Sequence, residues 1–222
     1  MNNLLDLIDR DIAGKHLLRH SFYLAWVRGE LTRQILADYA EQYYHHVAAF
    51  PTYLSAAHSR CDDPSTRKLL LKNLVDEEGG SPDHPQLWKN FAAAFGVTAK
   101  QLTRRALQPE TVRLISTFRQ ICGGDTAGAV AALYAYESQI PEICESKIDG
   151  LKRHYGVRDP QHFQYFTVHL EADREHSATE REMLNRWVTD RNIEAVRRSV
   201  ARVLDGLRDL LSGVCHRHAI PC

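Results

Sequence analysis

The sequence predicts an all-α protein. Apolar residues recur at helical spacing along the whole chain, and no series of short alternating runs bounded by turn residues indicates a sheet. The chain has 222 residues, of which 44% are hydrophobic, and this is enough to bury one core. We therefore expect a single helical-bundle domain over residues 1–214 and a flexible tail over residues 215–222.

Prolines, glycines and capping residues mark the limits of the predicted helices. The predicted helices cover approximately residues 4–12, 16–27, 32–59, 64–78, 84–95, 98–106, 109–122, 126–155, 160–188 and 192–211. Asp63 and Thr98 are predicted N-caps, because a short oxygen-bearing side chain can accept a hydrogen bond from the first turn. Gly29 is expected to end the second helix. Pro51 and Pro141 lie inside longer helices, where a proline should bend the helix or open a backbone bond.

Charge and composition exclude several classes of protein. Lys plus Arg and Asp plus Glu balance at 28 each, so no global field favours nucleic acid or an anionic membrane. The N-terminal 15 residues carry acids and lack the basic flank of a signal peptide, and no apolar run is long enough to span a bilayer. The five cysteines show no paired spacing, which favours reduced thiols. We expect a cytoplasmic protein that binds neither nucleic acid nor membrane.

The octet HLEADREH, residues 169–176, contains a possible metal-binding face. At about 100° per residue, His169, Asp173 and His176 fall within an arc of roughly 60° on one side of a helix. Imidazole and carboxylate together suit a first-row metal such as iron, manganese or zinc. The octet also fits an ordinary solvated face, because charged residues are interleaved with these three.

Further metal ligands are expected from facing helices, as in other helical bundles. Glu137 is a single acid between an apolar, small-residue run and a proline, and burying it is costly unless it is paired or ligating. Glu77 or Glu78 ends one helix, and His84 starts the next. Three carboxylates and three imidazoles would hold two divalent ions with a net charge of about +1, leaving open positions for dioxygen.

The C-terminal octet CHRHAIPC and an aromatic stripe between residues 36 and 53 are weaker candidates. The octet has two histidines and two cysteines, but its position and its proline favour a frayed chain end over a metal site. The stripe contains Tyr43 and His46, whose polar atoms need partners if they are buried.

Five longer runs carry a resemblance to a known family. These runs are HSFYLAWVRGELT (20–32), YAEQYYHHVAAFPTYLSAAHSRCDD (39–63), LVDEEGGSPDHPQLW (74–88), AGAVAALYAYESQIPEI (127–143) and HLEADREH (169–176). They resemble the family of the chlamydial protein associating with death domains, which forms para-aminobenzoate. That family belongs to the haem-oxygenase-like superfamily, with pyrroloquinoline-quinone synthase C and the TenA thiaminases. The resemblance extends to about residue 190.

The resemblance implies a haem-oxygenase-like bundle of seven to eight helices, forming a homodimer, with two divalent metal ions, iron or manganese. It places the metal ligands at Glu77, His84, Glu137, His169, Asp173 and His176, and so favours Glu77 over Glu78. It also implies an oxygen-dependent oxidoreductase of folate biosynthesis that uses an external reductant. We do not transfer the death-domain association, because nothing else in the sequence supports it.

In this family the enzyme is its own substrate, so the resemblance also assigns roles to two ordinary-looking residues. Tyr23 matches the tyrosine whose side chain is cut out to give the aromatic ring, and Lys147 matches the lysine that supplies the amino nitrogen. Tyr136 and Tyr43 can relay a radical or shape the pocket. One difficulty is distance, because ten residues of straight helix would separate Lys147 from Glu137 by about 15 Å.

Two other functions remain open from the sequence. A dimetal oxygenase could act on an exogenous small molecule such as a fatty acid, and an apolar channel would favour this alternative. A protein-interaction module with a purely structural metal would instead show a large exposed apolar surface.

Overall fold

The computed structural model describes residues 3–221, which form eleven α-helices and two short 3-10 helices without any strand. The α-helices are α1 (Asn3–Gly14), α2 (Ser21–Arg28), α3 (Arg33–Arg60), α4 (Pro64–Glu78), α5 (His84–Ala93), α6 (Ala99–Arg104), α7 (Pro109–Cys122), α8 (Thr126–Glu137), α9 (Ile140–Arg153), α10 (Gln164–Trp187) and α11 (Ile193–Arg217). The 3-10 helices are η1 (Leu17–Arg19) and η2 (Pro160–His162). The predicted all-α fold class is confirmed.

The number of helices exceeds the expected seven to eight, partly because one long predicted helix is divided. Residues 126–155 form α8 and α9, with the break after Glu137. Pro141, in the first turn of α9, has no N–H to donate to the carbonyl of Glu137, and the helix breaks where that hydrogen bond is missing. Pro51, by contrast, lies inside α3, which continues across it.

Both predicted N-caps are confirmed. The Asp63 carboxylate accepts a hydrogen bond of 2.7 Å from the backbone N–H of Thr66, and Pro64 occupies the first turn of α4. Thr98 and Gln101 form a reciprocal capping box at the start of α6. These caps satisfy N–H groups that have no partner within the helix, and so they fix where each helix begins.

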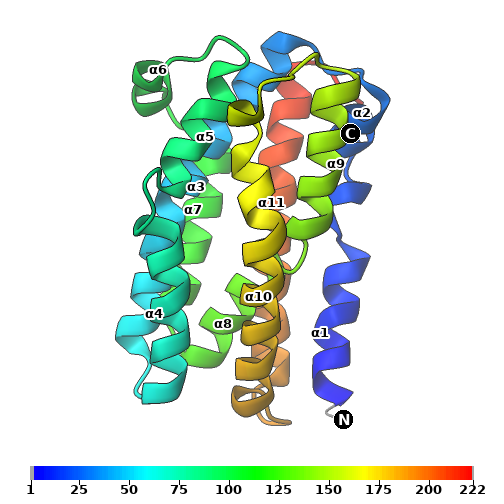
Figure 1. Ribbon diagram of the computed structural model, residues 1–222. Helices are drawn as coiled ribbons and strands as arrows, with labels where there is room; N and C mark the ends of the chain where they lie inside the picture. The colour runs from blue at the N-terminus through cyan, green and yellow to red at the C-terminus, as the bar shows by residue number, and fades with distance from the viewer. Residues whose placement is uncertain (1–2, 222) are drawn as a thin grey trace.

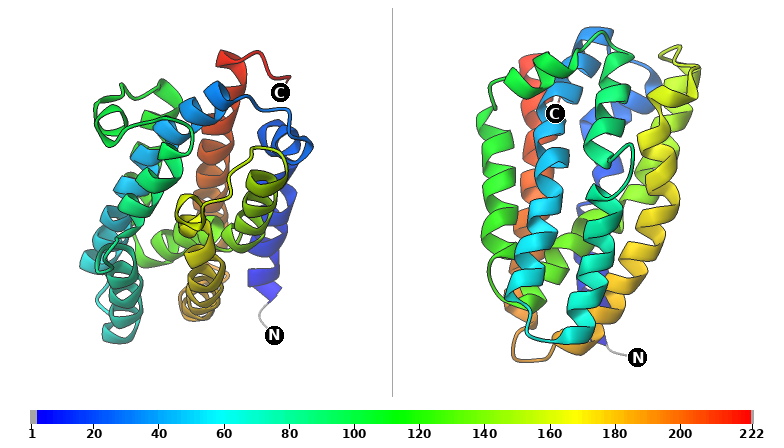
Figure 2. Two further views of the ribbon diagram at one scale, coloured as in Figure 1. Left: turned by 45° about the horizontal axis from the view of Figure 1, so that its top comes forward. Right: turned by 60° about the vertical axis from the view of Figure 1, so that its left-hand side comes forward.

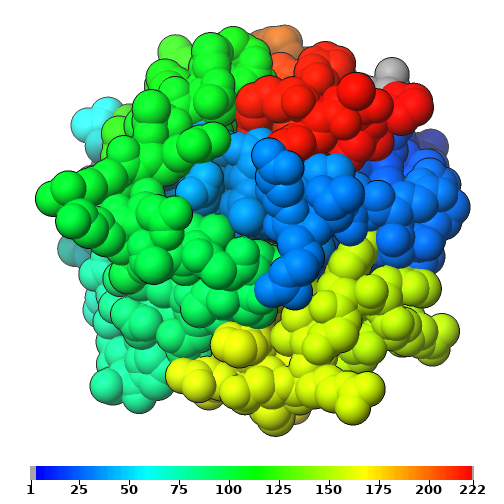
Figure 3. All heavy atoms as spheres, turned by 90° about the horizontal axis from the view of Figure 1, so that it is seen from above, coloured from blue at the N-terminus to red at the C-terminus, as the bar shows by residue number. Residues whose placement is uncertain are grey.

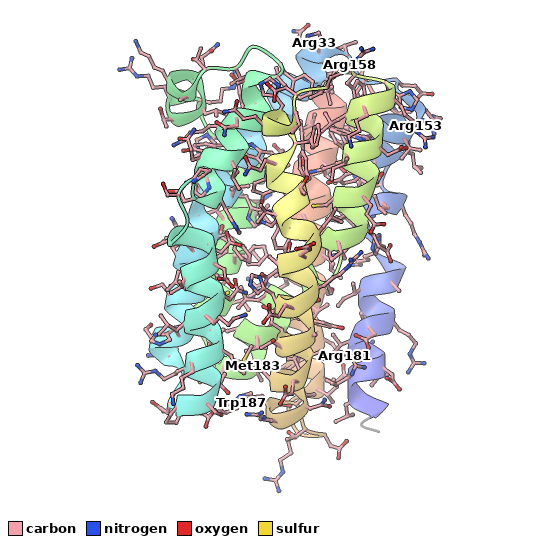
Figure 4. The ribbon with its side chains drawn as sticks, in the orientation of Figure 1. Arg33, Arg153, Arg158, Arg181, Met183 and Trp187 are labelled. Carbon is pink, nitrogen blue, oxygen red and sulfur yellow. The ribbon has the colours of Figure 1, made fainter. Side chains whose placement is uncertain are left out.

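The helices form an elongated bundle in which α10 has a central place. Figure 1 shows α10 between α4 and α5 on one side and α9 on the other, with α11 behind it. The right-hand view of Figure 2 shows α3, α10 and α11 running along the long dimension. In Figure 4, Met183 and Trp187 lie on the α4 side of α10, while Arg181 lies on the α1 side. Side chains on several faces of α10 therefore meet different helices.

The last helix is longer than the sequence indicated. We predicted its end at about Leu211 and a flexible tail from Cys215, but α11 continues to Arg217 and Cys215 is buried. This boundary was wrong because Arg217 and His218 contact Asp38 of α3, at 2.9 and 3.1 Å, and these ion pairs hold the end of the chain against the bundle. Cys222 lies outside the described residues.

One end of the bundle is covered by connecting segments. Figure 3 looks onto this end, where atoms of the α2 to α3 connection, the α9 to α10 connection and the chain terminus lie side by side. Within residues 3–221, no helix combines the length and the apolar character needed to cross a bilayer.

Candidate metal centre

Helix α10 directs its three candidate ligands into the bundle. His169, Asp173 and His176 are all at most 4% exposed, as their shared helix face predicted. The charged residues interleaved with them, Glu171, Arg174 and Glu175, are exposed. The octet is therefore half buried and half solvated, and the solvated-face interpretation applies only to the interleaved residues.

The first ligand group joins α4, α5 and α10. One ligand atom from each of three residues lies within 4.8 Å of the other two. These residues are Glu77 at the end of α4, His84 at the start of α5 and His169 on α10. The Glu77 Oε2 atom lies 2.8 Å from His84 Nδ1, and its Oε1 atom lies 3.9 Å from His169 Nε2. Glu78 is exposed and stands outside this group. The short loop after α4 turns Glu77 and His84 toward the same point, as expected.

The second ligand group joins α8 to α10. Glu137, Asp173 and His176 also lie within 4.8 Å of one another through one ligand atom each. His176 Nδ1 is 3.2 Å from Glu137 Oε1 and 3.4 Å from Asp173 Oδ1. The side-chain amide of Asn73, on α4, donates hydrogen bonds of 3.0 and 3.2 Å to the two Glu137 oxygens.

Hydrogen bonds orient two of the imidazoles. The Nδ1–H group of His169 donates to the backbone carbonyl of Tyr165 at 2.6 Å, which leaves Nε2 facing Glu77. The Nε2–H group of His176 donates to Asp76 at 3.1 Å, which leaves Nδ1 facing the carboxylates of Glu137 and Asp173. Such contacts fix the tautomer and the ring orientation of a metal-binding histidine.

The unpartnered atoms of these residues fit a pair of metal ions. Asp173 Oδ2, His84 Nδ1 and His176 Nδ1 are buried and have no aligned hydrogen bond from any described residue. Buried carboxylate and imidazole atoms that converge on one point suit a shared cation. The mixed nitrogen and oxygen donor set suits iron or manganese.

The charges in the site favour the same interpretation. Burial raises the pKa of Asp173 well above its ordinary value, and it also raises the pKa of Glu77. Burial disfavours the charged form of His176, but the carboxylates of Asp173 and Glu137 raise its pKa to about 11. A metal ion bound at Nδ1 would take the place of that proton.

A second cluster surrounds the two residues that the resemblance singled out. Lys147 is 3% exposed, and its Nζ lies 5.6 Å from the centroid of the Tyr23 ring. Nζ also donates a hydrogen bond of 2.5 Å to the hydroxyl of Tyr39. The same nitrogen lies within 5.4 Å of the ring centroids of Tyr43, Trp88 and Phe166. The structure brings Tyr23 and Lys147 together inside an aromatic box.

The position of Lys147 follows from the packing of α9 against α2, and not from a straight continuation of α8. After the break, α9 packs against α2, where Gly150 meets Trp26 so closely that a Cβ would lie 2.3 Å from the indole nitrogen. Lys147 lies three residues before Gly150, and Tyr23 lies three residues before Trp26. The two side chains therefore meet about one helical turn away from the Gly150–Trp26 contact, between the same two helices. Glycine at position 150 is required for this approach of the two helices.

Aromatic rings connect this box to the candidate ligands. Tyr165 stacks on His169 with ring centroids 4.0 Å apart, and Trp88 lies 4.9 Å from Tyr165. Trp88 in turn stacks on Tyr43 at 4.9 Å, and the Tyr43 hydroxyl donates a hydrogen bond of 3.1 Å to that of Tyr136. Tyr43 therefore connects the box to Tyr136, which lines the cavity beside the candidate ligands.

Sequence reasoning missed several members of both clusters. Tyr39 was noticed only as part of an aromatic stripe, and Asn73, Asp76 and Glu180 were not considered. Of these, only Glu180 had a usable sequence pattern, because it stands seven residues after Asp173 and four after His176 on the same helix face.

The chain is similar to proteins of known activity along almost its whole length. A family model described as iron-containing redox enzyme matches residues 37–207, a span that includes all six candidate ligands. A 4-aminobenzoate synthase of Chlamydia trachomatis serovar D is 47% identical over 96% of this chain and 94% of its own length. A 4-aminobenzoate synthase of Nitrosomonas europaea is 42% identical, over 96% of this chain and 91% of its own length.

Solved structures share the fold. A TenA homologue from Pseudomonas syringae superposes with a TM-score of 0.85, covering 96% of this chain and 93% of its own, at 20% sequence identity. At that level of identity the likeness concerns the fold, and it confirms the predicted haem-oxygenase-like architecture.

Proposed function

Because this chain belongs to the family of iron-containing redox enzymes, we propose that it forms 4-aminobenzoate by consuming its own Tyr23 and Lys147 side chains in an oxygen-dependent reaction. The single observation that carries the proposal is the aromatic box. In it the buried amine of Lys147 lies 5.6 Å from the centroid of the buried Tyr23 ring. Two similar enzymes named 4-aminobenzoate synthase support the identity of the product.

The six ligands and the box would have separate tasks. Iron or manganese held by the two ligand groups would supply one-electron oxidation, with dioxygen as the oxidant and an external reductant as the source of further electrons. The protein holds the imidazoles in one orientation through Tyr165 and Asp76. The rings of Tyr165, Trp88 and Tyr43 then offer a path of short aromatic contacts toward the box.

Inside the box, burial prepares both reacting side chains. Burial raises the pKa of Tyr23 well above its ordinary value, so the phenol keeps its proton until it is oxidised. Burial lowers the pKa of Lys147 to about 7, so a large fraction of the amine is neutral at physiological pH. A neutral, desolvated amine is a nucleophile, and it can pass its nitrogen to an oxidised aromatic ring.

The cavity beside the ligands favours a small co-substrate over an exogenous acyl chain. It is lined by four of the ligands together with Val47, Phe50, Tyr136 and Tyr165, and its cavity volume is about 10 Å³, roughly the space of one water-sized molecule. Pockets for drug-sized ligands usually enclose about 300–1,000 Å³. A cavity below this range suits dioxygen, and it gives no support to the fatty-acid alternative.

The first test is formation of the product without any added aromatic substrate. We expect purified, metal-loaded chain supplied with reductant and air to release at most about one 4-aminobenzoate per chain, because each chain holds one Tyr23. Liquid chromatography with mass detection would measure this yield against an anaerobic control. Many products per chain would show that the substrate comes from outside.

The pH dependence of the first turnover offers a second test. The folded-state pKa of Lys147 is lowered to about 7 from an ordinary 10.5, so the amine is charged below pH 7 and neutral above it. We therefore expect the initial rate to rise roughly tenfold per unit below about pH 7 and to level off above it. Rapid-quench measurements at constant metal content would give this profile, and a rate that falls through pH 7 would contradict a nucleophilic role for Lys147.

A further inference from the structure

Glu180 is a buried carboxylate beside the second ligand group that the proposed chemistry leaves without a role. It is 1% exposed, and neither of its oxygens accepts a hydrogen bond from any described residue. Its position four residues after His176 places it on the ligand-bearing face of α10. A buried carboxylate is destabilising unless it is paired or bound to a metal.

No lysine or arginine among the described residues forms an ion pair with Glu180. Its carboxyl group adjoins that of Glu137. A hydrogen bond between the two carboxyl groups would need a proton on one of them. The amide of Asn73 bonds to Glu137 and not to Glu180. The His176 imidazole contacts Glu137 at 3.2 Å, so Glu180 is the member of the pair that is left without a donor.

A small cavity lies beside both Glu180 and the ligand His176. The cavity lies between α4 and α10 and is lined by Leu70, Asn73, His176, Glu180 and Met183, among others. Figure 4 shows Met183 on the same side of α10, facing α4. Since His176 lines this cavity too, the Glu180 side chain and the second ligand group share one space.

The charge of the centre also calls for a further carboxylate. Two divalent ions and the carboxylates of Glu77, Glu137 and Asp173 leave a net charge of about +1 in a water-excluded interior. The ion of the second ligand group would have only three protein ligands, whereas iron and manganese bound by carboxylates commonly accept more. A fourth carboxylate would neutralise the centre.

We propose that Glu180 is a seventh protein ligand of the dimetal centre and binds the ion held by Glu137, Asp173 and His176. This inference rests on the metal centre of the proposed function, but not on the identity of the product. It would make the second position richer in oxygen ligands than the first, which has Glu77 and two histidines. Tyr165, stacked on His169 of the first ligand group, lies toward the aromatic box.

The proposal is tested by titrating the metal-free chain with Mn²⁺ and following free Mn²⁺ by electron paramagnetic resonance. We expect two ions per native chain, and in Glu180→Gln the ion at the second position should bind at least about tenfold more weakly. Glu182→Gln is the matched control, because Glu182 is exposed on the same helix and pairs with Arg186. Unchanged affinity for both ions in Glu180→Gln would overturn the proposal.

Thermal unfolding separates a ligand from a merely structural residue. Glutamine keeps the size of the side chain and carries no charge, so metal-free Glu180→Gln should be at least as stable as the native chain. Saturating Mn²⁺ should raise the Tm of the variant by less than it raises the Tm of the native chain. A variant that is destabilised without metal but gains the full Tm increase from Mn²⁺ would overturn the assignment. Both readouts are independent of 4-aminobenzoate, so failure of the product assay would leave them interpretable.

Discussion

Replacing Tyr23 with phenylalanine is expected to lower the yield of 4-aminobenzoate by more than about 100-fold, to the detection limit, because phenylalanine has no phenol to oxidise. Tyr23 lies outside both ligand groups, so Tyr23→Phe should bind as much iron or manganese as the native chain. The measurement is product per chain by mass detection, together with metal content by elemental analysis.

The matched control for this variant is Tyr53→Phe. Tyr53 is a fully buried tyrosine on α3 whose hydroxyl has no hydrogen-bond partner among the described residues, so losing that hydroxyl should cost little stability. We expect the native yield from Tyr53→Phe. If Tyr23→Phe also gave the native yield, the ring of the product could not come from Tyr23.

Replacing Lys147 with methionine should also reduce the yield by more than about 100-fold, because the variant keeps the shape of the side chain but has no amine to give. The loss of a buried amine removes a desolvation cost, so we expect Lys147→Met to fold and to bind metal normally. Product and metal content are measured as for Tyr23→Phe. An unchanged yield would mean that the nitrogen has another source.

Lys152→Met is the control, because Lys152 lies on the same helix and is exposed to solvent. A labelling experiment makes the comparison sharper. Native chain produced with ¹⁵N-lysine should release labelled 4-aminobenzoate, whereas a purely structural role for Lys147 predicts unlabelled product.

The fold and four of the six candidate ligands could be predicted from local sequence patterns. His169, Asp173 and His176 share one helix, so their 3.6-residue spacing alone places them on one face. Glu137 stood out because a lone acid in an apolar run needs a partner. The choice between Glu77 and Glu78 depended on the family resemblance, because both end the same helix. The structure gives the physical reason, since only Glu77 faces inward.

The aromatic box could not be predicted from such patterns. Tyr23 and Lys147 come from α2 and α9. They meet because the chain breaks after Glu137 and because Gly150, which has no Cβ, leaves space for the Trp26 ring. A single proline inside a predicted helix indicates either a bend or a break, and only packing decides between them. Asn73 was missed for a similar reason, because an amide on a polar helix gives no sign of the carboxylate it will meet.

The central claim is that the protein itself is the substrate, and mass spectrometry of the chain before and after one turnover tests it most directly. After reaction with metal, reductant and dioxygen, we expect the intact chain to lose mass in proportion to the 4-aminobenzoate released. Peptide mapping should locate the loss at Tyr23, with a second change at Lys147. Release of 4-aminobenzoate from a chain whose mass stays unchanged at both positions would contradict the account.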